Sequence, residues 1–74
     1  FTVLINPARE GMLHIKVTDD HLIGTNASII DHLGRLVKQF WLQNGRQSVN
    51  VKTLPAGIYF IQTSAGTKKF MIGK

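Results

Sequence analysis

The chain has 74 residues, of which 43% are hydrophobic and 18% charged, with no cysteine and a formal net charge of +5. This length corresponds to one small domain, the composition excludes a disordered chain, and the lack of cysteine excludes disulfides and thiolate metal sites. No apolar run approaches the ~20 residues of a membrane-spanning helix. Among the nine Lys and Arg residues only Lys68 and Lys69 are adjacent, and this scatter favours a solvated surface over a nucleic-acid site.

The apolar residues of the N-terminal part recur with a period close to two, which predicts β-strands. A first strand is expected over Thr2–Ile5, and the turn signal Asn6-Pro7 ends it. A second strand is expected over Met12–Thr18 and a third over Ala27–His32. The first half of the chain is therefore predicted to be entirely β.

A tight reversal is predicted between the third and fourth strands. Asp31 suits the first position of a type I turn, because its side chain can bond to nearby backbone, and Gly34 suits the fourth, because it accepts a positive φ. The fourth strand is expected over Arg35–Leu42. The pattern leaves open which of its two apolar faces points inward, that of Leu36, Phe40 and Leu42 or that of Val37 and Trp41.

Three more strands are predicted in the C-terminal part. The hairpin signal Asn44-Gly45 precedes a short strand over Ser48–Val51, and two further strands are expected over Ile58–Thr63 and Thr67–Ile72. About seven short strands at roughly ten-residue spacing, separated by turn signals, are typical of a β-sandwich. The predicted fold is an all-β, immunoglobulin-like antiparallel sandwich.

The segment from Leu54 to Tyr59 predicts a tyrosine corner, in which a Tyr near the start of the sixth strand bonds to backbone a few residues upstream. In this interpretation Leu54 closes the end of the sandwich and Pro55 stiffens the crossing. Gly57 takes a backbone angle that other residues resist. The alternative is a Tyr59 that packs without a specific bond.

Residues that could perform chemistry are few and separated. His14, His21 and His32 have no metal-ligand spacing, and Asp19 and Asp20 form a pair of carboxylates in a loop without the further ligands that a calcium site or a glycosidase needs. No nucleophile motif is present. We therefore expect no catalytic residue, no metal site and no cofactor.

Three segments together match the pattern of a known family, and in chain order they are Asn6-Pro7-Ala8 with Leu13-His14-Ile15, then Ser28–Val37, then Leu54–Phe60 with Thr67–Phe70. Over nearly its whole length the chain resembles the C-terminal sorting domain of proteins exported by the type IX secretion system of Bacteroidetes. Two positions depart from the family pattern. Leu4 stands where an aromatic residue often precedes Asn-Pro, and Ile30 stands where Tyr or Phe is usual.

The resemblance implies a non-enzymatic targeting signal at the C-terminal end of a cargo protein. Such a cargo reaches the periplasm by an N-terminal signal peptide, and the outer-membrane translocon recognises its sorting domain. A cell-surface sortase then cuts before the domain and commonly attaches the cargo to an anionic lipopolysaccharide. We expect residues 1–74 to be one such domain, a fragment of a larger exported protein that passes through the periplasm to the outer-membrane surface or the medium.

The C-terminal strand is the expected recognition element for the translocon. It is terminal, so a partner can approach it, and Lys68 and Lys69 place charge on opposite faces. The residues assigned to recognition are Lys68, Lys69, Phe70, Met71, Ile72, Gly73 and Lys74. A last strand at a sheet edge can also exchange or pair with a second copy. In the alternative interpretation the strand only completes the sheet.

Two other function classes compete with a secretion signal. A generic immunoglobulin- or fibronectin-like adhesion or carbohydrate-binding module predicts exposed aromatic residues, and Phe40 and Trp41 are the candidates. A small basic β-barrel that binds nucleic acid predicts aromatics interleaved with basic residues on one sheet, and only Lys38 accompanies that pair. We expect no nucleic-acid partner.

Overall fold

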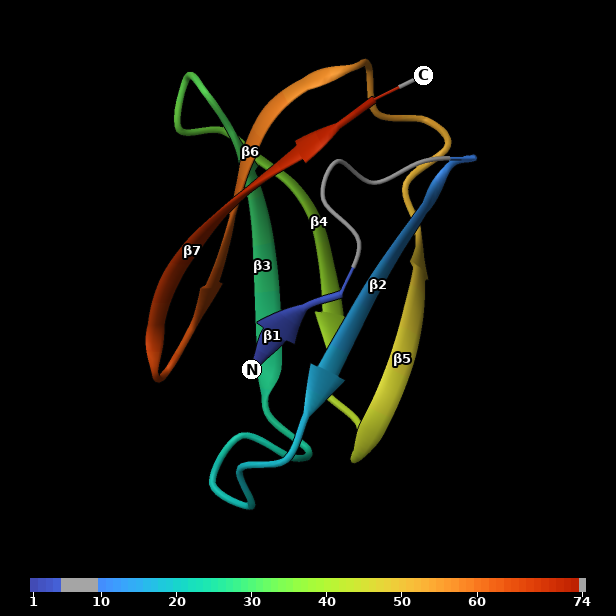
Figure 1. Ribbon diagram of the computed structural model, residues 1–74. Helices are drawn as coiled ribbons and strands as arrows, with labels where there is room; N and C mark the ends of the chain where they lie inside the picture. The colour runs from blue at the N-terminus through green and yellow to red at the C-terminus, as the bar shows by residue number, and fades with distance from the viewer. Residues whose placement is uncertain (5–9, 74) are drawn as a thin grey trace.

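The computed structural model describes residues 1–4 and 10–73. Within these residues seven strands and no helix form two antiparallel sheets, with the orders β1-β2-β5 and β4-β3-β6-β7 (Figure 1). The strands are β1 (Thr2–Val3), β2 (Met12–Val17), β3 (Asn26–Asp31), β4 (Leu36–Trp41), β5 (Gly45–Asn50), β6 (Gly57–Thr63) and β7 (Gly66–Ile72). The predicted all-β sandwich is confirmed. Asn6, Pro7 and Lys74 lie outside the described residues.

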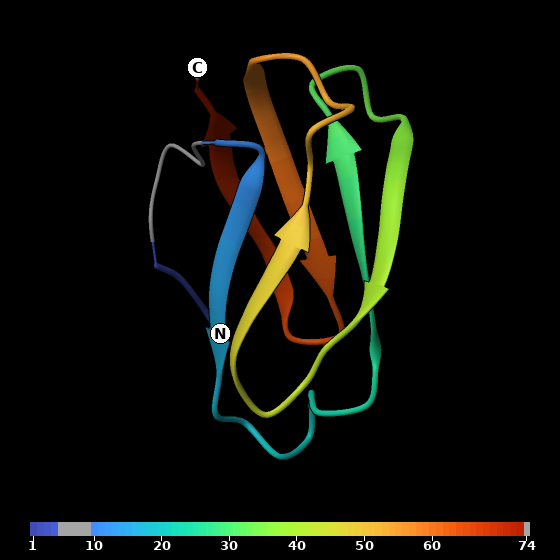
Figure 2. The same ribbon diagram turned by 90° about the vertical axis from the view of Figure 1, so that its right-hand side faces the viewer.

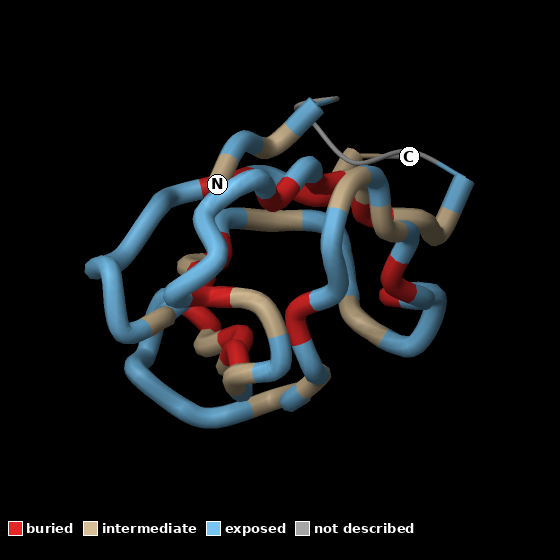
Figure 3. The backbone as a smooth tube through the Cα atoms, turned by 90° about the horizontal axis from the view of Figure 1, so that it is seen from below, coloured by how far each residue is buried: buried red, intermediate tan, exposed pale blue. Residues whose placement is uncertain are grey.

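The two sheets pack face to face and enclose one core, with β2 and β5 lying over β6 and β7 (Figure 2). Along β2 every second residue is buried, as the alternation in the sequence predicts. Short buried segments (red) alternate along the backbone with exposed segments (pale blue) (Figure 3). The buried apolar residues are Leu13, Ile15, Val17, Leu22, Ala27, Ile29, Leu42, Val49, Val51, Tyr59, Ile61, Phe70 and Ile72. None of the described segments forms a helix that is long and apolar enough to cross a membrane.

A β-bulge decides which residues of β4 face the core. Ile29 is paired with Lys38 and Ile30 with Leu36, so Val37 is an extra residue in β4. The bulge turns Val37 and Phe40 toward the core, while Leu36 points outward and is 56% exposed. The predicted faces are therefore wrong at Leu36, which does not share the face of Phe40 and Leu42, and at Val37, which packs against the core while Trp41 is exposed, because a strict two-residue period does not hold across a bulge.

The tyrosine corner is present at the start of β6. The Tyr59 hydroxyl donates to the carbonyl oxygen of Pro55 at 2.6 Å, and the Tyr59 side chain is buried. Its ring stacks on the ring of Phe70, with the centroids 5.8 Å apart. The partly buried Leu54 packs against the core beside this corner, as predicted. The corner fixes the loop that carries the chain from β5 in one sheet to β6 in the other.

Glycines occupy the two reversals where the sequence predicts them to be required. Gly34 has a φ of 83° and closes the β3–β4 turn, where its N–H donates to the Asp31 carbonyl at 3.0 Å. Gly57 has a φ of 155° at the first position of β6. A Cβ added at Gly34 would meet nothing within 4 Å, so the need for glycine there comes from the backbone angle and not from space.

Replacing Tyr59 with Phe is expected to lower the free energy of unfolding by about 1 kcal/mol, the net worth of one hydrogen bond, because the change deletes only the hydroxyl. Urea denaturation of both proteins measures the difference. Equal unfolding midpoints and slopes would contradict a stabilising corner bond.

Replacing Gly34 with Val is expected to lower the free energy of unfolding by about 1–3 kcal/mol, because a β-branched residue resists a positive φ. Gly34→Asn is the matched control, since Asn tolerates that region far better. Because nothing obstructs a side chain there, a loss for Asn as large as that for Val would contradict the backbone explanation.

Candidate recognition site at the end of the terminal strand

Segments that are far apart in the sequence meet at the end of the sandwich where β7 finishes. The β3–β4 turn, the loop over residues 51–56 and the end of β7 all lie there (Figure 1). A cavity of about 210 Å³ is lined by four of the predicted motif residues, Asp31, Leu54, Gly57 and Tyr59. A wider hollow of about 660 Å³ lies beside Gly73 and is lined by the same loop. The fold therefore brings the motifs of the sequence to one end of the molecule.

The carboxylate of Asp31 organises the β3–β4 turn. Its Oδ1 accepts the backbone N–H groups of Leu33 and Arg35, each at 2.9 Å, and its Oδ2 accepts Nε of Arg35 at 2.8 Å. The pKa of Asp31 lies below its usual value, chiefly because of the Arg35 backbone hydrogen bond. Partial burial opposes the shift, and the Arg35 guanidinium and the Leu33 N–H add to it.

Tyr59 lies opposite Asp31 in the register between β6 and β3. The pKa of Tyr59 is raised above 10.0, first by burial and second by the negative charge of Asp31. The phenol therefore keeps its proton at neutral pH, and this proton forms the hydrogen bond to Pro55. The Asp31 carboxylate and the Tyr59 hydroxyl thus both form hydrogen bonds that hold the loops at this end of the sandwich.

The predicted recognition residues divide between the two faces of β7, which is the edge strand next to β6. Phe70 is 0% and Ile72 6% exposed, and both belong to the core. Lys68, Lys69 and Met71 are exposed, and Gly73 is half-buried. A partner that touches the folded domain therefore meets the lysines and Met71. Lys74 lies outside the described residues.

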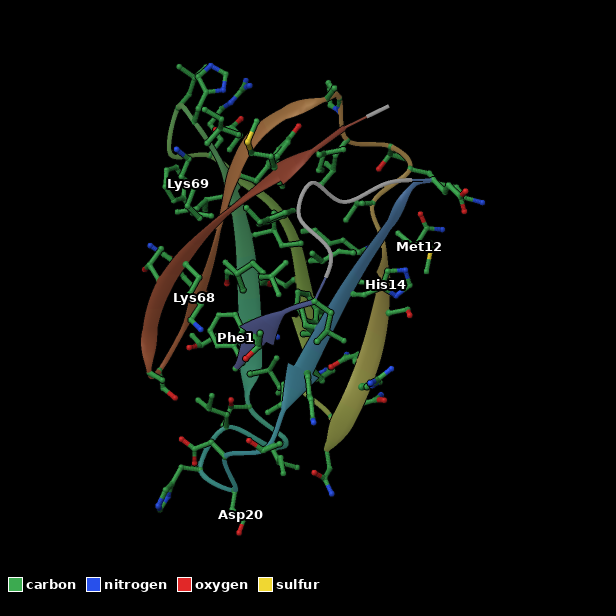
Figure 4. All side chains as sticks on the ribbon, viewed as in Figure 1. Phe1, Met12, His14, Asp20, Lys68 and Lys69 are labelled. Atoms are coloured by element: carbon green, nitrogen blue, oxygen red, sulfur yellow. The ribbon has the colours of Figure 1, made fainter. Side chains whose placement is uncertain are left out.

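Lys68 and Lys69 point to different neighbours (Figure 4). The Lys68 ammonium donates to the Phe1 carbonyl oxygen and lies 4.8 Å from the centroid of the Phe1 ring, so it joins β7 to the segment that begins β1. Lys69 is paired with Phe60 and projects from the other face of the sheet. The contact of Lys68 with Phe1 was not predicted, because no pattern in the sequence relates two residues at opposite ends of the chain.

The other candidate residues do not converge on a site. His14 shares a hydrogen bond of 2.9 Å with Ser48 on the outer face of the smaller sheet, and it lies far from Asp20 (Figure 4). The described residues contain no group of three or more His, Cys, Asp or Glu side chains that is able to hold a metal ion. Phe40 packs against the core while Trp41 is 63% exposed, so the two do not form an aromatic platform.

A comparison with protein families gives one match. The family described as the secretion system C-terminal sorting domain matches residues 6–73 of the 74-residue chain. No match is found among curated proteins or among solved structures. The matched range contains the Asp31 turn, the Tyr59 corner and the whole of β7.

Replacing Asp31 with Asn is expected to destabilise the domain at neutral pH and progressively less in acid. The folded-state pKa of Asp31 is depressed, so its contribution is full above the ordinary value of 3.8 and is lost as the pH falls through the folded pKa. Unfolding free energies of the two proteins across this range measure the difference. Other titrating groups are common to both proteins and cancel.

A difference in stability between the two proteins that stays constant from neutral to acidic pH would contradict an ionised Asp31 as the group that organises the turn. An increase in that difference toward acid would have the wrong sign and would contradict it equally.

Proposed function

Because the chain belongs to the secretion system C-terminal sorting domain family, we propose that it forms the C-terminal domain of a larger exported protein and targets that cargo to the type IX outer-membrane translocon. The domain is a type IX secretion sorting signal. This role implies interaction with the secretion machinery, attachment to an upstream cargo, and export to the cell surface or the extracellular space. The family match over residues 6–73 is the observation that carries the proposal.

In the proposed route the cargo first passes through the periplasm with its sorting domain folded. The translocon recognises the domain, and the cell-surface sortase cuts on its N-terminal side. The domain itself acts without catalysis or cofactor. Its groups with shifted pKa values, Asp31 and Tyr59, already form structural hydrogen bonds, which supports a binding role over a chemical one.

The terminal strand is the proposed recognition element. β7 is an edge strand, and lysine on an edge strand prevents indiscriminate pairing while a chosen partner can still approach. The buried Phe70 and Ile72 hold the strand in place, and the exposed Lys68, Lys69 and Met71 are its outward side chains. Recognition in this form requires the folded domain, because folding separates the two sets.

The test is export of a periplasmic reporter fused ahead of residues 1–74 in a type IX-competent host. The fusion is expected in the medium or at the cell surface, shortened by the length of the domain, and is expected to stay in the periplasm of a host that lacks the translocon. Secretion in both hosts, or retention in both, would contradict the proposed function.

Within that assay, removal of Gly73-Lys74 and the double change Lys68→Glu with Lys69→Glu are each expected to stop export. The thermal midpoint is expected to change little, because the Lys68 contact with Phe1 that the double change removes is exposed. The matched control reverses two charges elsewhere, Lys16→Glu with Arg46→Glu, a cross-strand pair of the smaller sheet. Normal export of both strand variants would place recognition elsewhere. Loss of export in proportion to lost stability would make the strand structural.

A further inference from the structure

The four-stranded sheet carries apolar side chains on the face that points away from the core. Ile30 is paired with Leu36 on one side and with Phe60 on the other. Ile58 is paired with Met71 in the next row. Cross-strand partners have Cβ atoms about 5 Å apart, so these side chains form one patch across all four strands. We name this patch the outer apolar face, and it consists of Ile30, Leu36, Ile58, Phe60 and Met71.

The outward direction of these side chains follows from their neighbours. Along each strand the adjacent residues are buried or pack against the core, and successive side chains point to opposite faces. Exposure is 56% for Leu36, 44% for Met71 and 38% for Ile58. Leu33, at the tip of the adjoining turn, is 66% exposed and extends the apolar surface. Ile30 and Phe60, which lie between these exposed residues, are half-buried. A contiguous patch of exposed apolar surface of this kind marks an interaction site.

The outer apolar face has definite borders. The next row across the sheet is polar and consists of Gln39, Ser28, Gln62 and Thr67. The opposite outer surface of the sandwich, on β2 and β5, pairs His14 with Ser48 and Lys16 with Arg46. Of the exposed large apolar residues in the described part of the chain, Leu33, Leu36, Ile58 and Met71 lie at the end of the larger sheet where β7 finishes, whereas Leu4 and Trp41 lie elsewhere.

The charged groups that border this face are Lys69 and Arg35, and Arg35 is ion-paired with Asp31 at 2.8 Å. Lys69 ends the row that contains Phe60, and the Arg35 side chain is 72% exposed at the β3–β4 turn. The nearest carboxylate, Asp31, points to the inner side and bonds to the turn and to Arg35. A complementary surface is therefore apolar at its centre and carries carboxylates at its rim.

We propose that the outer apolar face is the docking surface for a protein of the type IX machinery whose own surface is apolar with an acidic rim. This inference rests on the proposed function and deepens it. It extends recognition from the terminal strand across the sheet, with Lys69 and Met71 as the shared border. The apolar centre supplies affinity, and the cationic border supplies orientation.

Two other occupants fit the charges less well. A second copy of the chain would add a second Lys69 to the same interface, and the Asp31 carboxylate at this end already bonds to Arg35. An anionic membrane is held by clusters of roughly 4–8 Lys or Arg residues, and this face has far fewer. A protein partner with carboxylates matches both the flat apolar surface and the sparse cations.

The experiment measures binding of the reporter fusion to type IX translocon that has been solubilised from host outer membranes, together with export in cells. Leu36→Glu and Ile58→Glu are each expected to weaken binding by about ten-fold or more, as loss of an interface anchor does, and to reduce export. Trp41→Glu is the matched control, because Trp41 is 63% exposed on the same sheet beyond the polar row. It is expected to bind and export normally.

The acidic rim is tested by charge at one position. Leu36→Lys removes the same apolar side chain as Leu36→Glu, and it is expected to retain several-fold more binding because it attracts carboxylates. Equal binding of the two variants would overturn the acidic rim. Binding and export that survive both Leu36→Glu and Ile58→Glu in folded protein would overturn the docking surface.

The remaining outcomes also decide the question. Sedimentation at rising concentration and flotation with phosphatidylcholine–phosphatidylglycerol vesicles are measured for the unmodified fusion and for Leu36→Glu. Self-association or vesicle binding that Leu36→Glu abolishes would assign the face to a second copy or to lipid and overturn the proposal.

If the unmodified fusion is neither bound nor exported, the proposed function fails and this inference fails with it. If the unmodified fusion is bound and exported, and the Leu36→Glu and Ile58→Glu variants are bound and exported equally well, the proposed function stands and this inference alone fails.

Discussion

The Tyr59 hydroxyl donates to the Pro55 carbonyl at 2.6 Å, and this bond fixes the loop by which the chain crosses from the smaller sheet to the larger one. The terminal strand and the β3–β4 turn both lie beside Tyr59. The Tyr59 ring stacks on Phe70 of the terminal strand β7, and on the adjacent strand β3 Tyr59 is paired with Asp31, whose carboxylate holds the neighbouring turn. A domain of this size without disulfides is held by packing and a few such bonds.

Long polar side chains complete the two open sides of the sandwich. On one side Lys68 of β7 reaches the carbonyl oxygen of Phe1, which begins the smaller sheet. On the other side Gln47 of β5 donates to the carbonyl oxygen of Trp41, the last residue of β4, at 2.7 Å. Each contact joins an edge strand of one sheet to an edge of the other. Both cover backbone groups that would otherwise invite pairing with other chains.

The proposed docking depends on a division between the faces of the domain. Inward residues of β6 and β7 form the core, and outward residues of the same strands form the outer apolar face and its cationic border. The proposed recognition therefore requires the folded domain, since an unfolded chain presents neither the outer apolar face nor its cationic border. Under the proposed docking, the secretion machinery recognises side chains that the folded sheet brings together, and not a linear motif.

Local interactions explain what the sequence determined by itself. The seven strands were predicted from the local alternation of apolar residues, and the Asp31–Gly34 turn and the Tyr59 corner rest on contacts within a few residues, such as a side chain that bonds to nearby backbone or a glycine at a positive φ. These features, and the family pattern that contains them, were predicted. They could be predicted because the residues that indicate them lie close together in the sequence.

Pairing between distant segments decided the rest. The bulge at Val37, the sheet to which β4 belongs, and the contact of Lys68 with Phe1 depend on which strand lies beside which. The run from Ile58 to Ile61 predicts a strand that is apolar on both faces, but it does not say what lies next to its outer side. Only the register of four strands gathers those outer residues into one patch, because a sheet face is assembled from segments that the sequence keeps apart.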